Sequence, residues 1–275
     1  MKNPDIPITD DHIHIDPVHG RGLDAVKDFM RAGGTHLFLV TKPSSSFGIL
    51  PRTGQEYTHV FDETIAIADQ ARALGVHVFV VLGIHPAEIT RLSAAGSLPG
   101  AVAAMKKGLD CAASYIAEGK AVALKSGRPH YPVPDEVLTA SNEVLSHALA
   151  LAAGLDCAVQ VHAETGPCND IVDLAERAGL SPRRVVKHYA TADTPLIPSF
   201  LATNPDIPEL ARISRLFTME SDYMDEDSRP GAVIGPKSVP RNTFRMLAEG
   251  IITETDAYRI HKETPETVYG VEIQR

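Results

Sequence analysis

Two histidines at alternate positions, His12 and His14, stand in the first apolar segment of the chain, "DDHIHID". Successive side chains of a β-strand point to opposite faces, so a strand here would aim both imidazoles the same way. Two neighbouring imidazoles suit two adjacent positions on one metal ion. The spacing indicates a metal-binding pair, although packed or surface histidines can produce the same short pattern.

Four further residues that could take part in chemistry close later apolar segments. They are Lys125, His162, His188 and Asp222. A lone histidine at a strand end is more often a hydrogen-bonded core residue than a ligand, but several together with the first pair favour one shared metal site. The lysine raises a separate question, because an unpaired ammonium at the end of a buried strand is unfavourable unless it is solvent-facing, paired or chemically altered.

Short apolar segments alternate with helical patterns along the whole chain. We predict strands at residues 8–15, 35–40, 76–83, 120–125, 157–162, 184–188, 196–200 and 216–221. Predicted helices include residues 56–74, 102–118, 135–153 and 169–178. This alternation is the signature of an α/β fold, the (β/α)8 TIM barrel, here as a single domain over residues 1–275. An open doubly wound sheet is the main alternative, but the chain lacks its glycine-rich first turn.

The alternation within the predicted strands separates polar from apolar side chains. In the first strand, His12 and His14 share one face, and Ile13 and Ile15 share the other. The apolar face must meet the surrounding helices, so the polar face points to the barrel axis, and the strand ends converge on one mouth. In the sixth strand Lys187 falls on the helix-facing side, which favours an earlier end for that strand.

Composition limits the class of protein. Lys and Arg number 26 against 35 Asp and Glu, a net charge of −9 that disfavours a protein that holds long nucleic acid through its phosphates. The three cysteines form no CxxC pair and fit packing in a reducing compartment. No apolar stretch has the length of a membrane span and the first residues lack a signal-peptide pattern, so we expect a cytoplasmic protein without membrane partners.

Several motifs make the chain resemble a known superfamily. They are "DDHIHID", "LGIHPAE", "VQVHAE", "VVKHYA", "MESDYMDE" and "GPKSVPRN…YRIHKETPETVYGV". They are similar to motifs of the metal-dependent amidohydrolase superfamily, and within it of the TatD-related hydrolases of the archaeal type. The resemblance implies a TIM barrel with one or two divalent metals and hydrolysis by a metal-bound hydroxide.

The resemblance also assigns roles to individual positions. It gives metal-ligand roles to His12, His14, Lys125, His162, His188 and Asp222. Asp222 doubles as general base, and His85 lines the mouth. The metal is left open among zinc, manganese, iron and cobalt, with zinc preferred.

The chain departs from the TatD pattern at Lys125, and also over residues 190–215, which makes the seventh predicted strand the least certain element. Lys125 stands in "LKSG", where TatD-type enzymes carry a glutamate in a "GEIG"-like turn. The chain here resembles the phosphotriesterase-like lactonases, whose lysine at this strand is carboxylated and bridges two metals. We therefore predict an N6-carboxylated Lys125, with a free lysine that binds substrate or serves a single-metal site, or a structural ion pair, as alternatives.

Basic residues near the predicted mouth could bind an anionic substrate group or a developing oxyanion. They are Arg128, His130, Lys237 and Arg241. A structural salt bridge is the alternative for Arg128, and a surface charge at a helix start is the alternative for Arg241. Glu164 and Cys168, on the loop after the fifth strand, are further candidates for substrate contact.

The chemistry expected at such a site is hydrolysis of an ester-type bond. The substrate would be a small molecule or a short phosphoester: a phosphoester by analogy with TatD relatives, or a lactone by analogy with lysine-containing sites. The alternatives are a 3′–5′ deoxyribonuclease-like nuclease, which the negative charge weakens, and a non-catalytic metal-binding barrel. A homo-oligomer is compatible with the sequence.

Overall fold

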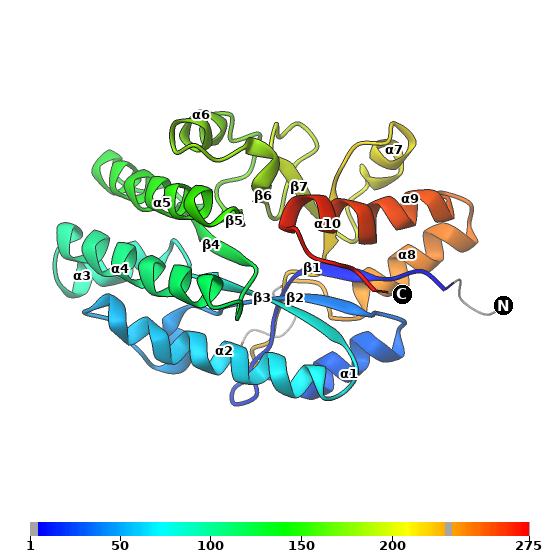
Figure 1. The fold of residues 1–275 in the computed structure, drawn as a ribbon, viewed down its shortest axis with the longest axis horizontal. Helices are drawn as coiled ribbons and strands as arrows, with labels where there is room; N and C mark the ends of the chain where they lie inside the picture. Colours follow the sequence, from blue (N-terminus) through cyan, green and yellow to red (C-terminus); the bar gives the residue numbers. More distant parts are fainter. Residues whose placement is uncertain (1–4, 229–232, 275) are drawn as a thin grey trace.

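The computed structural model describes residues 5–228 and 233–274. Within these residues nine parallel strands form one curled sheet, and β1 to β8 neighbour one another in chain order (Figure 1). The strands are β1 (Thr9–His14), β2 (His36–Val40), β3 (His77–Gly83), β4 (Ala123–Gly127), β5 (Ala158–His162), β6 (Val185–Lys187), β7 (Ile197–Leu201), β8 (Thr218–Glu220) and β9 (Tyr223–Met224). The fold is the TIM barrel that the strand pattern predicts.

The barrel closes between β8 and β1. After β8 the chain turns through Asp222, whose φ is 46°, and β9 then pairs in parallel with β1. The Asp222 N–H donates to the His12 carbonyl at 2.9 Å, and the Thr218 hydroxyl donates to the Asp11 carboxylate at 2.9 Å. Closure therefore sets Asp222 beside His12 at the mouth.

Helices surround the sheet on its outer side (Figure 1). They are α1 (Leu23–Arg31), α2 (Tyr57–Arg72), α3 (Glu88–Ala95), α4 (Leu98–Ala117), α5 (Asp135–Leu155), α6 (Asp170–Arg177), α7 (Ile207–Arg212), α8 (Ser238–Ala248), α9 (Glu254–Tyr258) and α10 (Thr264–Tyr269). Short helical turns add η1 (Ser44–Phe47), η2 (Gly54–Glu56), η3 (Pro182–Arg184) and η4 (Arg259–Glu263). No helix of the described chain is both long and apolar enough to cross a membrane.

Side-chain alternation divides the core into two layers, as the sequence predicts. Ile13 on β1 and Ile15 just after it belong to the outer core shared with the helices, where Phe29 of α1 is fully buried. The interior of the barrel holds small and branched residues of β2 to β7 together with Phe38 and Tyr269. The Tyr269 ring, from α10, packs on Phe38 with ring centroids 4.2 Å apart, so the C-terminal helix fills part of the barrel interior.

Most element boundaries lie within two residues of the predicted ones, and two elements differ by more. The fourth strand runs from Ala123 to Gly127, not from residue 120 to 125, so Lys125 lies in the middle of it. Gly127 makes this extension feasible: its φ is 149°, and a Cβ there would lie 1.8 Å from the His162 carbonyl oxygen. Helix α4 begins four residues before the predicted start, because the Ser97 hydroxyl caps it by accepting the Gly100 N–H.

Lys187 is the last residue of β6, which ends one residue before the predicted end of the sixth strand. It is 1 % exposed, on the side of the strand opposite to Val186 of the barrel interior. Its Nζ donates to the carbonyls of His188 at 2.9 Å and Ala163 at 3.4 Å. These carbonyls solvate the ammonium under the loop that follows β5, which explains how the strand tolerates a lysine there.

Candidate metal centre

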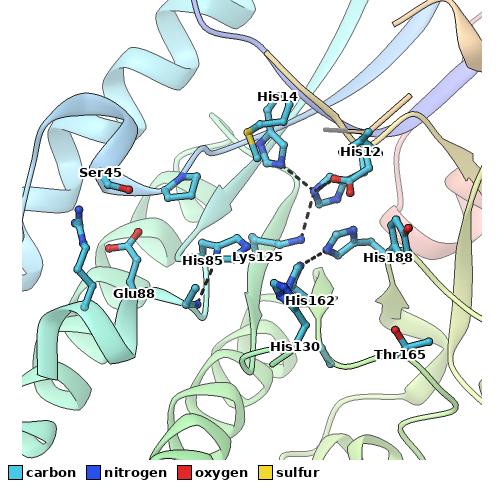
Figure 2. Close-up of a pocket in the computed structure, with 18 residues that line it drawn as sticks. His12, His14, Ser45, His85, Glu88, Lys125, His130, His162, Thr165 and His188 are labelled. Carbon is cyan, nitrogen blue, oxygen red and sulfur yellow. Dashed lines mark hydrogen bonds and ion pairs between the residues drawn. The ribbon is translucent and has the colours of Figure 1, made fainter. Parts of the chain in front are cut away.

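A cavity of about 590 Å³ opens at the carboxyl ends of the strands. Its lining includes the six residues predicted as ligands: His12, His14, Lys125, His162, His188 and Asp222. Figure 2 shows the imidazoles of His12 and His14, both from β1, close to that of His188, with the Lys125 amine reaching toward His12. The structure thus brings together every member of the predicted set.

A hydrogen-bond chain fixes the tautomer of His12. Its Nδ1 lies 2.7 Å from Gln160 Oε1. The amide nitrogen of Gln160 points to the Asp11 carbonyl at 2.7 Å and the Tyr269 hydroxyl at 2.8 Å. A carbonyl can only accept, so the amide nitrogen must face Asp11 and the amide oxygen must face His12. The His12 proton therefore sits on Nδ1, and Nε2 carries a free lone pair.

The same reasoning applies to His14. Its Nδ1 lies 2.8 Å from the Val40 carbonyl and must donate to it. The two Nε2 atoms of His12 and His14 are 3.2 Å apart, so two bare lone pairs face each other. Burial lowers the pKa of His14 to about 3 and that of His12 well below its usual value, which leaves both rings unprotonated at neutral pH. A cation that both nitrogens share removes the repulsion.

His188 and His162 continue the cluster on the other side of the cavity. The His188 ring stacks on His12 with centroids 4.1 Å apart. His162 Nδ1 lies 2.7 Å from His188 Nε2, and His162 Nε2 lies 2.7 Å from His130 Nδ1. Burial lowers the pKa of both His162 and His188. His188 Nδ1 is buried with no hydrogen bond among the described residues, and Glu220 Oε1 is the carboxylate oxygen 3.5 Å away.

Asp222 supplies the carboxylate of the site. Its Oδ1 lies 3.8 Å from His12 Nε2, and one ligand atom each from His12, His188 and Asp222 fall within 4.8 Å of one another. Burial raises the pKa of Asp222 to about 6, while the Lys125 ammonium opposes that rise. Asp222 also has a left-handed φ, an unfavourable backbone conformation for this residue type that functional sites often contain.

Lys125 enters the same space from β4. It is 2 % exposed, and its Nζ lies 3.4 Å from His12 Nε2. Gly83 lets β3 approach it, since a Cβ at Gly83 would lie 1.9 Å from the Lys125 carbonyl oxygen. Burial lowers the pKa of Lys125 to about 7, although the nearby carboxylates of Asp222 and Glu220 oppose this. A substantial share of the amine is therefore neutral near pH 7.

These features fit a divalent metal. The imidazoles of His12 and His14 with fixed tautomers, the further imidazole of His188 and the ionisable Asp222 carboxylate form the nitrogen and oxygen donor set that zinc and related metals prefer. Gln160 and Val40 orient the first two rings from behind, as outer partners of metal-binding histidines commonly do.

The remaining predicted residues divide into two groups. His85 and His130 line the cavity, and the His85 and His162 ring centroids are 4.6 Å apart. Arg128 instead forms ion pairs with Glu164 and Asp170, which agrees with its salt-bridge alternative. The guanidinium is buried beneath the mouth with its donors directed at those carboxylates, so the structure does not bring it into the cavity.

Three more candidates also lie apart from the metal cluster. Lys237 and Arg241 line a separate hollow at the start of α8, where Lys237 Nζ lies 3.2 Å from the Asp28 carboxylate. The structure does not bring these two residues to the cavity, because α8 begins beside α1. Cys168 is buried, and its thiol is directed at the carbonyl and carboxylate oxygens of Glu164.

Sequence reasoning missed other residues of the cavity wall. Ser45, Glu88, Arg91 and Tyr189 all line it. The spacing of Glu88 and Arg91, three residues apart just after the third strand, could have indicated a shared face of a helix beginning at the mouth. Ser45 offered no comparable signal, because its segment has neither strand nor helix periodicity.

Fold and site together define a metal-binding TIM-barrel hydrolase. The model of the family described as "TatD related DNase" matches residues 9–270, and the chain belongs to this family. It is 34% identical over 281 residues to "Uncharacterized protein MJ1127" of Methanocaldococcus jannaschii, covering 98% of each chain.

Solved structures share the fold at low identity. A phosphotriesterase homology protein from Escherichia coli, complexed with phosphate in its active site, has a TM-score of 0.63 at 14% identity, covering 96% of this chain and 99% of that one. A lactonase, Lmo2620, from Listeria monocytogenes has a TM-score of 0.60 at 10% identity, covering 98% and 96%. Both comparisons confirm the barrel.

Proposed function

We propose that this chain hydrolyses ester-type bonds, either phosphoesters or lactones and other carboxylic esters, at a divalent metal centre in the cavity. The observation that carries the proposal is the pair of bare Nε2 atoms of His12 and His14, 3.2 Å apart, beside the Asp222 carboxylate. Membership of the TatD-related DNase family supports hydrolysis at such a centre.

Each residue of the cluster has a distinct part in this proposal. His12, His14, His162 and His188 would hold the metal together with Asp222 and Lys125. When bound, the metal supplies Lewis-acid polarisation and makes water more acidic. The Asp222 carboxylate accepts the proton of the attacking water and can release it to the leaving group. Zinc is the metal we favour, since neutral imidazoles dominate the donor set.

Lys125 is proposed to be carboxylated. Its neutral amine attacks the carbon of CO₂, a new N–C bond forms, and one proton leaves to solvent. The resulting carbamate has one negative charge and two oxygens, as does the carboxylate of the glutamate that TatD-type enzymes carry at this position. Burial and a lowered pKa support the reaction, because both increase the share of free amine.

Nuclease activity is the second candidate, because the matching family is described as TatD related DNase. A net charge of −9 disfavours binding of long DNA along an extended surface. A 3′–5′ deoxyribonuclease acting on a short end needs only a local site. Small phosphoesters and short oligonucleotides therefore belong in the same assay.

The test is a substrate screen with zinc-loaded protein. Bis(p-nitrophenyl) phosphate, γ-butyrolactone, a short single-stranded oligodeoxynucleotide and the amide p-nitroacetanilide are compared. We expect turnover of a phosphoester or an ester, and its loss when the metal is removed by a chelator. Cleavage of the amide alone, or no cleavage with zinc, manganese, iron or cobalt, contradicts the proposal.

A further inference from the structure

The cavity has a second polar wall away from the metal cluster. Figure 2 places Ser45 and Glu88 on the side opposite His12 and His188, and Arg91 lines the same cavity. Ser45 comes from η1, while Glu88 and Arg91 are three residues apart on α3. This wall is built from the segments that follow β2 and β3.

The Glu88 carboxylate joins the segments of this wall by hydrogen bonds. Its Oε1 accepts the Ser44 N–H at 2.9 Å, and its Oε2 accepts the hydroxyls of Ser44 at 2.7 Å and Tyr57 at 2.8 Å. The residue is 4 % exposed, and burial raises its pKa. Its carboxylate thus anchors the η1 segment to α2 and α3.

Among the described residues Arg91 forms no direct ion pair, and Glu88 is its carboxylate neighbour through a shared partner. The Ser44 hydroxyl accepts from Arg91 and donates to Glu88, and the Arg91 charge opposes the rise in the pKa of Glu88. Arg91 Nη2 donates to the Ser44 hydroxyl at 2.8 Å and to the Ile49 carbonyl at 2.7 Å, both neutral oxygens. Among the residues described, no carboxylate oxygen approaches the guanidinium within the 4.0 Å of an ion pair. Its Nε–H is buried and has no acceptor in the described part of the chain.

We propose that Arg91, together with the Ser45 hydroxyl, binds an anionic group of the substrate, a carboxylate or a phosphoryl group, that lies away from the bond to be cleaved. The inference rests on the proposed function, in which the metal cluster receives the scissile group. Both Nη2 hydrogens are engaged by Ser44 and Ile49, so the Nη1 donors and the positive charge of the guanidinium remain for such an anion. A purely structural tether would use Nη2 and the attraction to Glu88, and would leave the Arg91 Nε–H without an acceptor among the described residues.

The experiment measures binding, so it does not depend on turnover. Calorimetry with zinc-loaded protein compares straight-chain dicarboxylates, from malonate to adipate, with the monocarboxylates of equal carbon number. A further ligand, 3-phosphonopropionate, tests a phosphoryl group at one end. One carboxylate can reach the metal, and the other reports on the distal wall. We expect at least one dicarboxylate to bind about 10–100-fold more tightly than its monocarboxylate.

Variants assign that advantage to Arg91. Arg91→Met should abolish it, and Arg91→Lys should retain part of it, because the positive charge remains but the guanidinium donors do not. Arg72→Met is the matched control. Arg72 also lies on a helix and also donates to a backbone carbonyl, that of Val78, but it does not line the cavity. Thermal unfolding of each variant verifies that the fold is retained.

The outcomes separate this inference from the proposed function. Equal binding of mono- and dicarboxylates by the wild type, or an advantage that persists in Arg91→Met, overturns the role of Arg91. Ester hydrolysis without any such advantage overturns the distal site alone. An Arg91-dependent advantage in a protein that hydrolyses no ester supports the distal site and contradicts the proposed function. The end group that gives the tighter Arg91-dependent binding, a carboxylate or a phosphonate, identifies the class of anion.

Discussion

Gln160 offers a sharp test of how the protein prepares its metal ligands. Gln160→Leu removes the oxygen that accepts the His12 Nδ1 proton at 2.7 Å, and the nitrogen that donates to Asp11 and Tyr269. The His12 proton is then no longer held on Nδ1 and can move to Nε2. A protonated Nε2 has no lone pair for a metal and is directed at His14.

The size of the effect follows from the loss of one hydrogen bond behind a ligand. Such losses reduce metal affinity by about 10–100-fold, which corresponds to about 1.4–2.8 kcal/mol. The assay is competition for zinc with a chromophoric chelator at pH 7.5, where both rings are neutral. Gln160→Glu keeps an acceptor toward His12 and should bind zinc more tightly than Gln160→Leu, although it loses the donor to the Asp11 carbonyl.

Gln55→Leu serves as the control, since Gln55 is an exposed glutamine away from the cavity. Thermal unfolding of the metal-free variants verifies that the barrel is intact, because each unpaired buried polar group costs about 1–3 kcal/mol. If a folded Gln160→Leu binds zinc within twofold of the wild type, the tautomer of His12 is not held by Gln160.

Three further predictions concern the base, the lysine and acid stability. Asp222→Asn should lower turnover at saturating metal by about 10²–10⁴-fold, and near wild-type turnover would place the base elsewhere, with Glu164 next. Bicarbonate should increase the activity that metal-free wild type regains when metal is added back, and Lys125→Glu should be more active than Lys125→Ala. If bicarbonate has no effect and Lys125→Glu is no more active than Lys125→Ala, Lys125 does not act as a carbamate. Burial lowers the pKa of His261 to about 4 from 6.5, so its contribution to the unfolding free energy is complete above pH 6.5 and is lost as the pH falls through 4. His261→Gln should therefore remove about 3 kcal/mol of the loss between pH 7 and 4 in urea unfolding of metal-free protein, and identical pH dependence in both proteins would exclude His261 as a contributor.

Local patterns were sufficient to predict the barrel and the convergence of the predicted ligands. The period of two in "DDHIHID" directs His12 and His14 inward while Ile13 and Ile15 pack on the helices. Strand parity carries this information because a barrel has only an inner and an outer face. The same reasoning predicted that Lys125 would reach the cavity, although its strand continues two residues further.

Features that depend on contacts between distant segments could not be predicted in this way. The partners of Arg128, Glu164 and Asp170, lie on a loop and a helix whose orientations no periodicity describes. Arg91 was missed for a similar reason, since its contacts with Ser44 and Ile49 form only when the segments after β2 and β3 pack together. Charge and position near a predicted mouth are thus weaker guides to substrate contacts than strand parity is to ligands.

The metal content of purified protein tests the central assignment most directly. Elemental analysis after exhaustive dialysis compares the wild type with the double variant His12→Ala, His14→Ala, whose fold is verified by circular dichroism. The outward apolar faces of the strands hold the barrel together, so the variant should fold while losing its metal. We predict one or two divalent ions per chain in the wild type and a loss of metal in the variant. Full metal occupancy in the double variant would contradict a centre built on these two histidines.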